Sequence, residues 1–232
     1  MRTREQMTKQ PLWLAGVLSA PMLVLVAPGA HAGSATCLGE PATIEVRHAD
    51  SDVFGTPGPD VMVVTGRFVR VFGLDGGDRI CTNGHIVGGP GDDRLLGFRR
   101  TNVVLDLTLS GGPGDDRIFR RGPRDGDPHL VPTTRGGPGD DVLKGGNNLD
   151  RLVGGRGIDR LLGDGLRDTL RGGRGEDTLL GEGDPDQLFG GPEDDRLRGG
   201  AGRDFAAGNA GFDKASGGPG ADACDAEVQV SC

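Results

Sequence analysis

Residues 136–162 read GGPGDDVLK, GGNNLDRLV and GGRGIDRLL when they are written as three rows of nine. Every row begins with Gly, has Asp at its sixth position and has Leu at its eighth. Three residue types that recur together at one period indicate an internal repeat rather than a glycine-rich linker. This nine-residue period decides the fold.

The period continues to residue 225, so that residues 136–225 form ten regular nonapeptides. The sixth position is occupied by Asp in every one of them: Asp141, Asp150, Asp159, Asp168, Asp177, Asp186, Asp195, Asp204, Asp213 and Asp222. The eighth position is Leu from Leu143 to Leu197, and is then Ala206, Ala215 and Cys224. One small or apolar residue per repeat is therefore available for a core.

Each nonapeptide predicts one short strand and one turn. The eighth residue lies between mixed or polar neighbours, as in Thr169-Leu170-Arg171, which is the pattern of a strand with one buried face. Positions one to six are rich in glycine, which permits positive φ and close approach of the backbone. A single repeat cannot bury its leucine alone, so stability must come from stacking successive copies.

Upstream of residue 136 the same pattern occurs with interruptions. Residues 55–135 contain degenerate repeats whose sixth-position aspartates are Asp60, Asp78, Asp93 and Asp116. The stretch 123–134 breaks the register and is predicted to be a surface loop. Residues 33–54 are expected to form an N-terminal cap segment, and residues 226–232 a C-terminal cap tail.

The first 32 residues have the features of a secretory signal peptide. Basic residues precede an apolar run from Leu12 to Ala27, and Ala30-His31-Ala32 supplies small residues for cleavage. Pro21 interrupts this run, and it is shorter than the ~20 residues that a spanning helix needs. We therefore expect a secreted, extracellular protein that is not stably inserted in a membrane.

Composition argues against several classes of function. The net charge is −8, which disfavours nucleic acid as a partner and favours cations. The paired carboxylates recur along the chain, whereas hydrolysis of a glycoside needs one pair in one pocket. No phosphate-binding Gly-rich motif ending in Lys-Ser or Lys-Thr is present in the sequence. The sequence therefore predicts that the protein is not an enzyme.

The pattern Gly-Gly-x-Gly-x-Asp-x-apolar-x resembles the haemolysin-type, or RTX, calcium-binding nonapeptide repeat. The clearest copies are residues 88–96, 111–119, 136–144, 154–162 and 172–180. The resemblance implies an all-β, right-handed parallel β-roll, a β-solenoid with two nonapeptides per coil. It also implies several Ca²⁺ ions, each held between turns that are two repeats apart, such as those of Asp141 and Asp159. The ligands would be the sixth-position aspartates and carbonyl groups of the turns, with Gly137, Gly139, Gly155, Gly157, Gly173 and Gly175 in the clearest turns.

Calcium chemistry leads to the same expectation. Calcium takes six to eight oxygen ligands, and one turn offers a carboxylate with a few carbonyls, so two stacked turns are needed to complete a shell. Without the ion a column of aspartates would repel itself, which predicts that metal binding is coupled to folding. Repeats 163–171, 181–189 and 190–198 depart from the glycine pattern, and their sites are the least certain to bind metal.

The four cysteines Cys37, Cys81, Cys224 and Cys232 are expected to form two disulfides in an oxidising compartment. Cys224 takes the inward eighth position of the final repeat, so a bond to Cys232 would fold the tail over the open end of the stack. A bond between Cys37 and Cys81 would fix the first coils. We predict these two pairings.

One alternative to a plain calcium-binding protein remains from the sequence. In this alternative, calcium only rigidifies an extracellular adhesin or structural surface module, and exposed residues bind a cell-surface polysaccharide or a protein partner.

Overall fold

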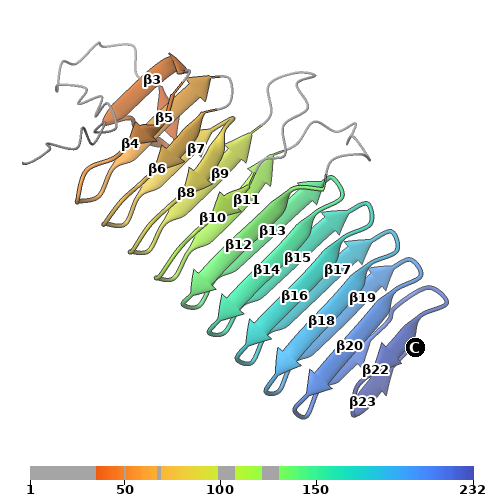
Figure 1. The fold of residues 1–232 in the computed structure, drawn as a ribbon. Coiled ribbons are helices and arrows are strands. Elements are labelled where there is room, and N and C mark those ends of the chain that lie inside the picture. Colours follow the sequence, from red (N-terminus) through yellow and green to blue (C-terminus); the bar gives the residue numbers. More distant parts are fainter. Residues whose placement is uncertain (1–34, 50, 67–68, 99–107, 122–130) are drawn as a thin grey trace, which may run out of the picture.

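A computed structural model of the chain describes residues 35–49, 51–66, 69–98, 108–121 and 131–232. The predicted signal peptide, residues 1–32, lies outside these ranges. Within them, every regular element is a β-strand, and no helix is long and apolar enough to cross a membrane. The chain forms a parallel β-solenoid of about nine turns with about 18 residues per turn (Figure 1). The predicted stack with two nonapeptides per coil is confirmed.

Two parallel sheets run along the stack. The first contains β3 (Ile44–Ala49), β5 (Val61–Gly66), β7 (Arg79–Thr82), β9 (Arg94–Phe98), β11 (Arg117–Arg121), β13 (Val142–Asn147), β15 (Arg160–Gly165), β17 (Thr178–Gly183), β19 (Arg196–Ala201), β21 (Lys214–Ser216) and β23 (Val228–Val230). The second contains β4 (Val53–Phe54), β6 (Arg70–Phe72), β8 (His85–Val87), β10 (Leu109–Ser110), β12 (Thr133–Pro138), β14 (Arg151–Arg156), β16 (Thr169–Arg174), β18 (Gln187–Pro192), β20 (Phe205–Ala210) and β22 (Ala223–Asp225).

The core is a double column of eighth-position side chains between the sheets. In the regular part, Leu143, Leu161 and Leu179 follow one another in the first sheet, and Leu152 and Leu170 do so in the second. All of these side chains are fully buried. Each leucine packs against the equivalent leucines of the coils on either side, so an isolated repeat could not bury its leucine and would not be stable.

Coil length varies in the N-terminal half. Consecutive coils are joined through the aspartates of their turns, which are 18 residues apart from Asp141 onward. Asp78 and Asp93 are 15 residues apart, whereas the next two intervals are 23 and 25 residues. The extra residues include 99–107 and 122–130, which lie outside the described ranges. The stack therefore accepts insertions between strands while it keeps the register of the turns.

Two predicted boundaries are wrong. The predicted N-terminal cap 33–54 includes β3 and β4, which pair in parallel with β5 and β6 and so belong to the first coil. Among the described residues of this segment, the antiparallel hairpin of β1 (Thr36–Cys37) and β2 (Glu40–Pro41) lies outside the coils. The predicted loop 123–134 ends too late, because Thr133 and Thr134 are in β12 and Thr134 is fully buried between Leu109 and Leu152.

Both predicted disulfides are confirmed. Cys37 is bonded to Cys81, which ties the N-terminal hairpin to β7, with 5.5 Å between their Cα atoms. Cys224 is bonded to Cys232, which ties the end of the chain to β22. The predicted C-terminal tail provides β23, the last strand of the first sheet. Each bridge therefore closes one end of the solenoid.

Candidate metal centre

The sixth-position aspartates form two ladders, one on each long edge of the solenoid. The first edge carries Asp60, Asp78, Asp93, Asp116, Asp141, Asp159, Asp177, Asp195 and Asp213. The second edge carries Asp150, Asp168, Asp186, Asp204 and Asp222. We call each aspartate a rung. All rungs except Asp222 are buried. The structure therefore brings together all the aspartates that the sequence singled out, and separates them into two rows.

One backbone hydrogen bond joins each rung to the next. The N–H of a rung donates to Oδ1 of the rung in the following coil, as Asp141 donates to Asp159 and Asp159 to Asp177. These N···O distances are 2.7–2.9 Å along both ladders. The bond pairs turns that are two repeats apart, which is the pairing that the resemblance to the RTX repeat implies.

The second carboxylate oxygen, Oδ2, is buried without a hydrogen-bond partner on almost every described rung. This holds for Asp78, Asp93, Asp116, Asp141, Asp150, Asp159, Asp168, Asp177, Asp186, Asp195, Asp204, Asp213 and Asp222. An unpaired buried oxygen is costly, and one that recurs at one position of a repeat calls for a common partner. A metal cation is such a partner.

Asp60 differs from the rest of the first ladder. Its Oδ2 accepts hydrogen bonds from the backbone N–H of Thr56, at 2.6 Å, and from the Thr56 hydroxyl, at 3.0 Å. Thr56 stands where the regular turns have their second glycine. Among the predicted metal ligands, Asp60 therefore has the least need of a cation to satisfy its Oδ2. In the sequence, threonine in place of the second glycine of the turn marks this difference.

The first glycine of each turn makes room for the carboxylate. A Cβ on Gly136 would lie 2.0 Å from Oδ2 of Asp141 in the same turn, and the equivalent contacts in the other regular repeats are 2.2–2.6 Å. The carboxylate thus folds back against a bare Cα atom. Any side chain at position one would displace the carboxylate, which explains why Gly and Asp recur together.

The glycines at positions two and four hold the carbonyl groups of neighbouring turns close together. Gly137, Gly139, Gly155, Gly157, Gly173 and Gly175 have φ between +118° and +143°. A Cβ on any of them would lie 2.0–2.2 Å from a carbonyl oxygen of the preceding coil. Carbonyl oxygens are the other ligands that calcium prefers. In the described residues no three His, Cys, Asp or Glu side chains converge, so a bound ion would have to draw on these carbonyls.

The departures from the glycine pattern do not change the path of the turns. Asp164, Leu166, Glu182, Asp184 and Glu193 take positive φ between 68° and 81°, as the glycines of regular turns also take positive φ. The rungs of the same repeats, Asp168, Asp186 and Asp195, remain buried. Stacking therefore imposes a conformation on these residues that costs them energy in isolation.

Burial makes the ladders electrostatically unfavourable without a counter-ion. Desolvation is the largest cause, and it raises the pKa of Asp141, Asp159 and Asp177 to about 7, of Asp116 to about 8 and of Asp168 to about 9. The backbone hydrogen bond from the preceding rung opposes this shift, and neighbouring carboxylates add to it. Near neutral pH these five rungs therefore favour a bound proton or a bound cation.

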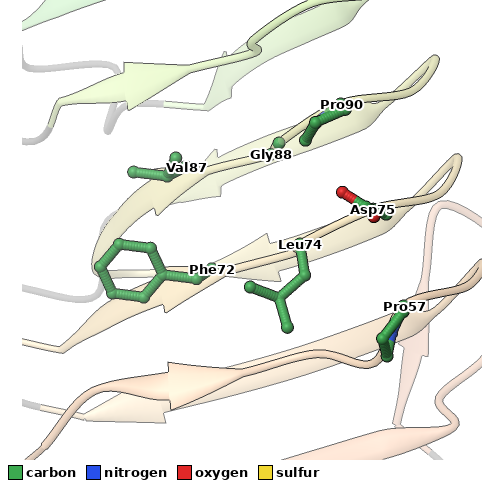
Figure 2. A pocket seen from close by; sticks show the side chains of 8 residues that line it. Pro57, Phe72, Leu74, Asp75, Val87, Gly88 and Pro90 are labelled. Atoms are coloured by element: carbon green, nitrogen blue, oxygen red, sulfur yellow. The ribbon is translucent and has the colours of Figure 1, made fainter.

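A groove on the outer face of the second sheet is a separate feature. Pro57, Phe72, Leu74, Asp75, Val87 and Pro90 line it, and Figure 2 shows their side chains on neighbouring coils. Its volume is about 360 Å³, and the Phe72 ring stacks on that of Phe54 with 4.9 Å between centroids. Asp75 is the only carboxylate among these lining residues.

The comparisons with known proteins agree with the ladders. The family model for the RTX calcium-binding nonapeptide repeat matches in four copies, at residues 108–120, 135–161, 162–197 and 198–228. No curated protein and no solved structure matches the chain. The chain therefore contains RTX calcium-binding nonapeptide repeats, which imply calcium binding. The structure extends the first ladder upstream of the matched residues, to Asp60.

The contacts around two glycines in consecutive repeats predict different effects of alanine substitution on thermal stability. Gly155→Ala would place its Cβ 2.1 Å from the Gly137 carbonyl oxygen at a φ of +138°, whereas Gly165→Ala meets nothing closer than 3.5 Å. We expect Gly155→Ala to lower the thermal unfolding midpoint of the calcium-loaded protein by several degrees, and Gly165→Ala to change it by no more than about 2 °C. Thermal melts followed by circular dichroism would test this. Equal losses would mean that the turns are not closely stacked.

The raised pKa values predict that protons can replace cations in part. A rung whose pKa is higher in the folded state stabilises that state most below its unfolded pKa of about 4, and the contribution is lost as pH rises through about 6–9. After dialysis free of calcium, the protein should therefore contain more β-structure at pH 5 than at pH 8. Circular dichroism at both pH values decides this, and identical spectra would contradict it.

Proposed function

We propose, from the RTX repeats in this chain, that the protein is a secreted calcium-binding protein that folds as calcium binds and has no enzymatic activity. The observation that carries the proposal is the column of buried Oδ2 atoms without a hydrogen-bond partner. These atoms recur at the spacing of the repeat. A cation bound between successive rungs would satisfy two of them at a time.

Each ion would be held by two adjacent turns of one edge. In the clearest case the ligands are the carboxylates of Asp141 and Asp159 with carbonyl groups of the turns that contain Gly137, Gly139 and Gly155. When bound, calcium supplies positive charge that offsets the desolvation of the carboxylates. The turns supply flexible oxygen ligands, and their glycines allow the backbones to approach.

The first edge is the better candidate of the two. Its turns 136–141, 154–159 and 172–177 have glycine at both positions two and four. On the second edge, turns 163–168 and 181–186 have Asp164, Leu166, Glu182 and Asp184 at these positions, all with positive φ, whereas turns 199–204 and 217–222 keep both glycines. We therefore assign the tighter calcium sites to turns 136–141, 154–159 and 172–177.

Secretion rests on two features. Residues 1–32 have the order of a cleavable signal peptide, and both disulfides are typical of an oxidising compartment outside the cytoplasm. Extracellular calcium is abundant, so sites of modest affinity would be filled there.

The experiment is a calcium titration of residues 33–232. We expect little β-structure in chelator at pH 8, and folding at calcium concentrations on the order of 10⁻⁴–10⁻³ M, because ion binding and stacking are one process. Circular dichroism measures the midpoint, and magnesium serves as the competing ion. An unchanged spectrum with calcium would refute the proposal.

Two substitutions provide an internal control. Asp159 has rungs on both sides, Asp141 and Asp177, whereas Asp222 is joined only to Asp204. Asp159→Asn should therefore raise the calcium midpoint more than Asp222→Asn, since a central carboxylate contributes to two ions. The amide oxygen of Asn can still accept the rung hydrogen bond, which keeps the comparison to the charge. Equal shifts would mean that neighbouring sites do not share ligands.

The second candidate is a calcium-rigidified adhesin or surface module, and the groove of Figure 2 favours it. Leu74 and Val87 are exposed beside the stacked Phe54–Phe72 pair, which gives an apolar platform on the outer face. Binding of the calcium-loaded protein to an immobilised polysaccharide, weakened by Leu74→Ser without a change in the calcium midpoint, would support this candidate. Binding that is unaffected by Leu74→Ser would exclude this groove.

A further inference from the structure

The first rung of the second edge, Asp150, has a different environment from the rungs that follow. In the ten regular repeats the first position is always glycine. Gly145 is the first position of the repeat that contains Asp150. In the preceding coil Arg120 takes this position, because Phe119 of β11 is paired with Lys144 of β13 and the next residues, Arg120 and Gly145, therefore lie side by side. On the other side of β11, Arg120 is paired with Gly97. An arginine therefore interrupts a column of glycines at this level.

The rung position of the same coil is also altered. The N–H of Thr169 donates to the carbonyl oxygen of Asp150, and the N–H of Arg151 donates in the same way to that of Pro132. Pro132 thus occupies the place of a rung. Because proline has no N–H, it cannot donate the hydrogen bond that Oδ1 of every later rung on this edge accepts.

Asp150 consequently lacks the hydrogen bond that Oδ1 of every later rung on this edge accepts. Among the described rungs it is the one whose Oδ1 and Oδ2 are both buried without a hydrogen-bond partner. The guanidinium of Arg120 lies beside it, with Nη1 3.7 Å from Oδ1. Only 8% of the Arg120 side chain is exposed, and none of the Asp150 side chain. Arg120 and Pro132, two departures from the repeat in one coil, thus act together: Pro132 removes a hydrogen-bond donor from the Asp150 carboxylate, and Arg120 places a positive charge beside it.

We propose that Arg120 is a permanent counter-ion for Asp150. The guanidinium of Arg120 takes the role that a calcium ion would have between later rungs. The start of the second ladder is therefore independent of calcium. The comparison with calcium rests on the function proposed above, whereas the ion pair does not. A guanidinium is always charged near neutral pH and cannot dissociate from the chain. The coil that follows the insertion at 122–130 therefore has a charge-compensated first turn at any calcium concentration.

A double-mutant cycle tests the pair. Arg120→Met removes the charge and keeps an apolar stem, Asp150→Asn removes the carboxylate charge, and Arg121→Met changes an exposed arginine on the same strand. In saturating calcium we expect Arg120→Met to lower the thermal midpoint by about 5–10 °C, since a buried carboxylate loses its partner, and Arg121→Met to have no measurable effect. In the Asp150→Asn background the loss from Arg120→Met should fall to less than half.

Further variants keep the proposal falsifiable if Arg120→Met folds poorly. Arg120→Lys retains the charge and should keep most of the stability. Pro132→Ala restores an N–H at the rung position and should reduce the loss caused by Arg120→Met. Equal effects of Arg120→Met and Arg121→Met, or an equal loss in the Asp150→Asn background, would overturn the proposal.

The calcium dependence separates this proposal from the proposed function. A tenfold excess of calcium should not restore Arg120→Met, and restoration would show that the guanidinium position is open to the metal. If the wild type shows no response to calcium, the proposed function fails, but the cycle still measures the Arg120–Asp150 pair.

Discussion

The buried carboxylate at the sixth position of each nonapeptide is the constraint on which the rest of the structure depends. After the first rung of each ladder, one oxygen of each rung accepts the N–H of the preceding rung and so fixes the register of successive coils. The other folds against a bare glycine Cα, which leaves no room for a side chain there. Leucines fill the interior, but leucines alone would allow coils to slide. The charge that fixes the register also has to be compensated, so stacking and cation binding are linked.

The two edges of the solenoid meet this constraint differently. The first edge runs nearly the whole length of the molecule, from Asp60 to Asp213, and tolerates coils of 15 to 25 residues. In the part of the chain that the structure describes, the first rung of the second edge is Asp150. On the second edge, Asp164 forms an ion pair with Lys144, and Leu166 takes positive φ. Residues other than glycine also take positive φ on the first edge, at Leu74, Glu193 and Asn209, so both ladders tolerate departures from the repeat.

The nine-residue period was sufficient to predict the strands, the inward leucines and the rung aspartates, and the resemblance to the RTX repeat implied their pairing two repeats apart. It failed where the period itself was absent. Ile44 and Val46 in β3 belong to the first coil, but no glycine-rich turn with an aspartate precedes them. Arg120 and Pro132 look unrelated in sequence because an insertion separates them. Only the register of β11 against β13, and of Pro132 beneath Asp150, shows that they modify one turn.

The ends of the ladders show how a repeating charge can be terminated. At the start of the first edge, Thr56 donates two hydrogen bonds to the oxygen that is unpaired on later rungs. At its other end, the N–H of Asp213 donates to Glu227, a longer acid 14 residues further on in a shortened last coil. At the start of the second edge, Arg120 faces Asp150. These three ends use different side chains: Thr56 and Arg120 partner a carboxylate, and Glu227 accepts the N–H of the last rung. At three of the four ends, a specific side chain thus takes the place of a neighbouring rung or cation.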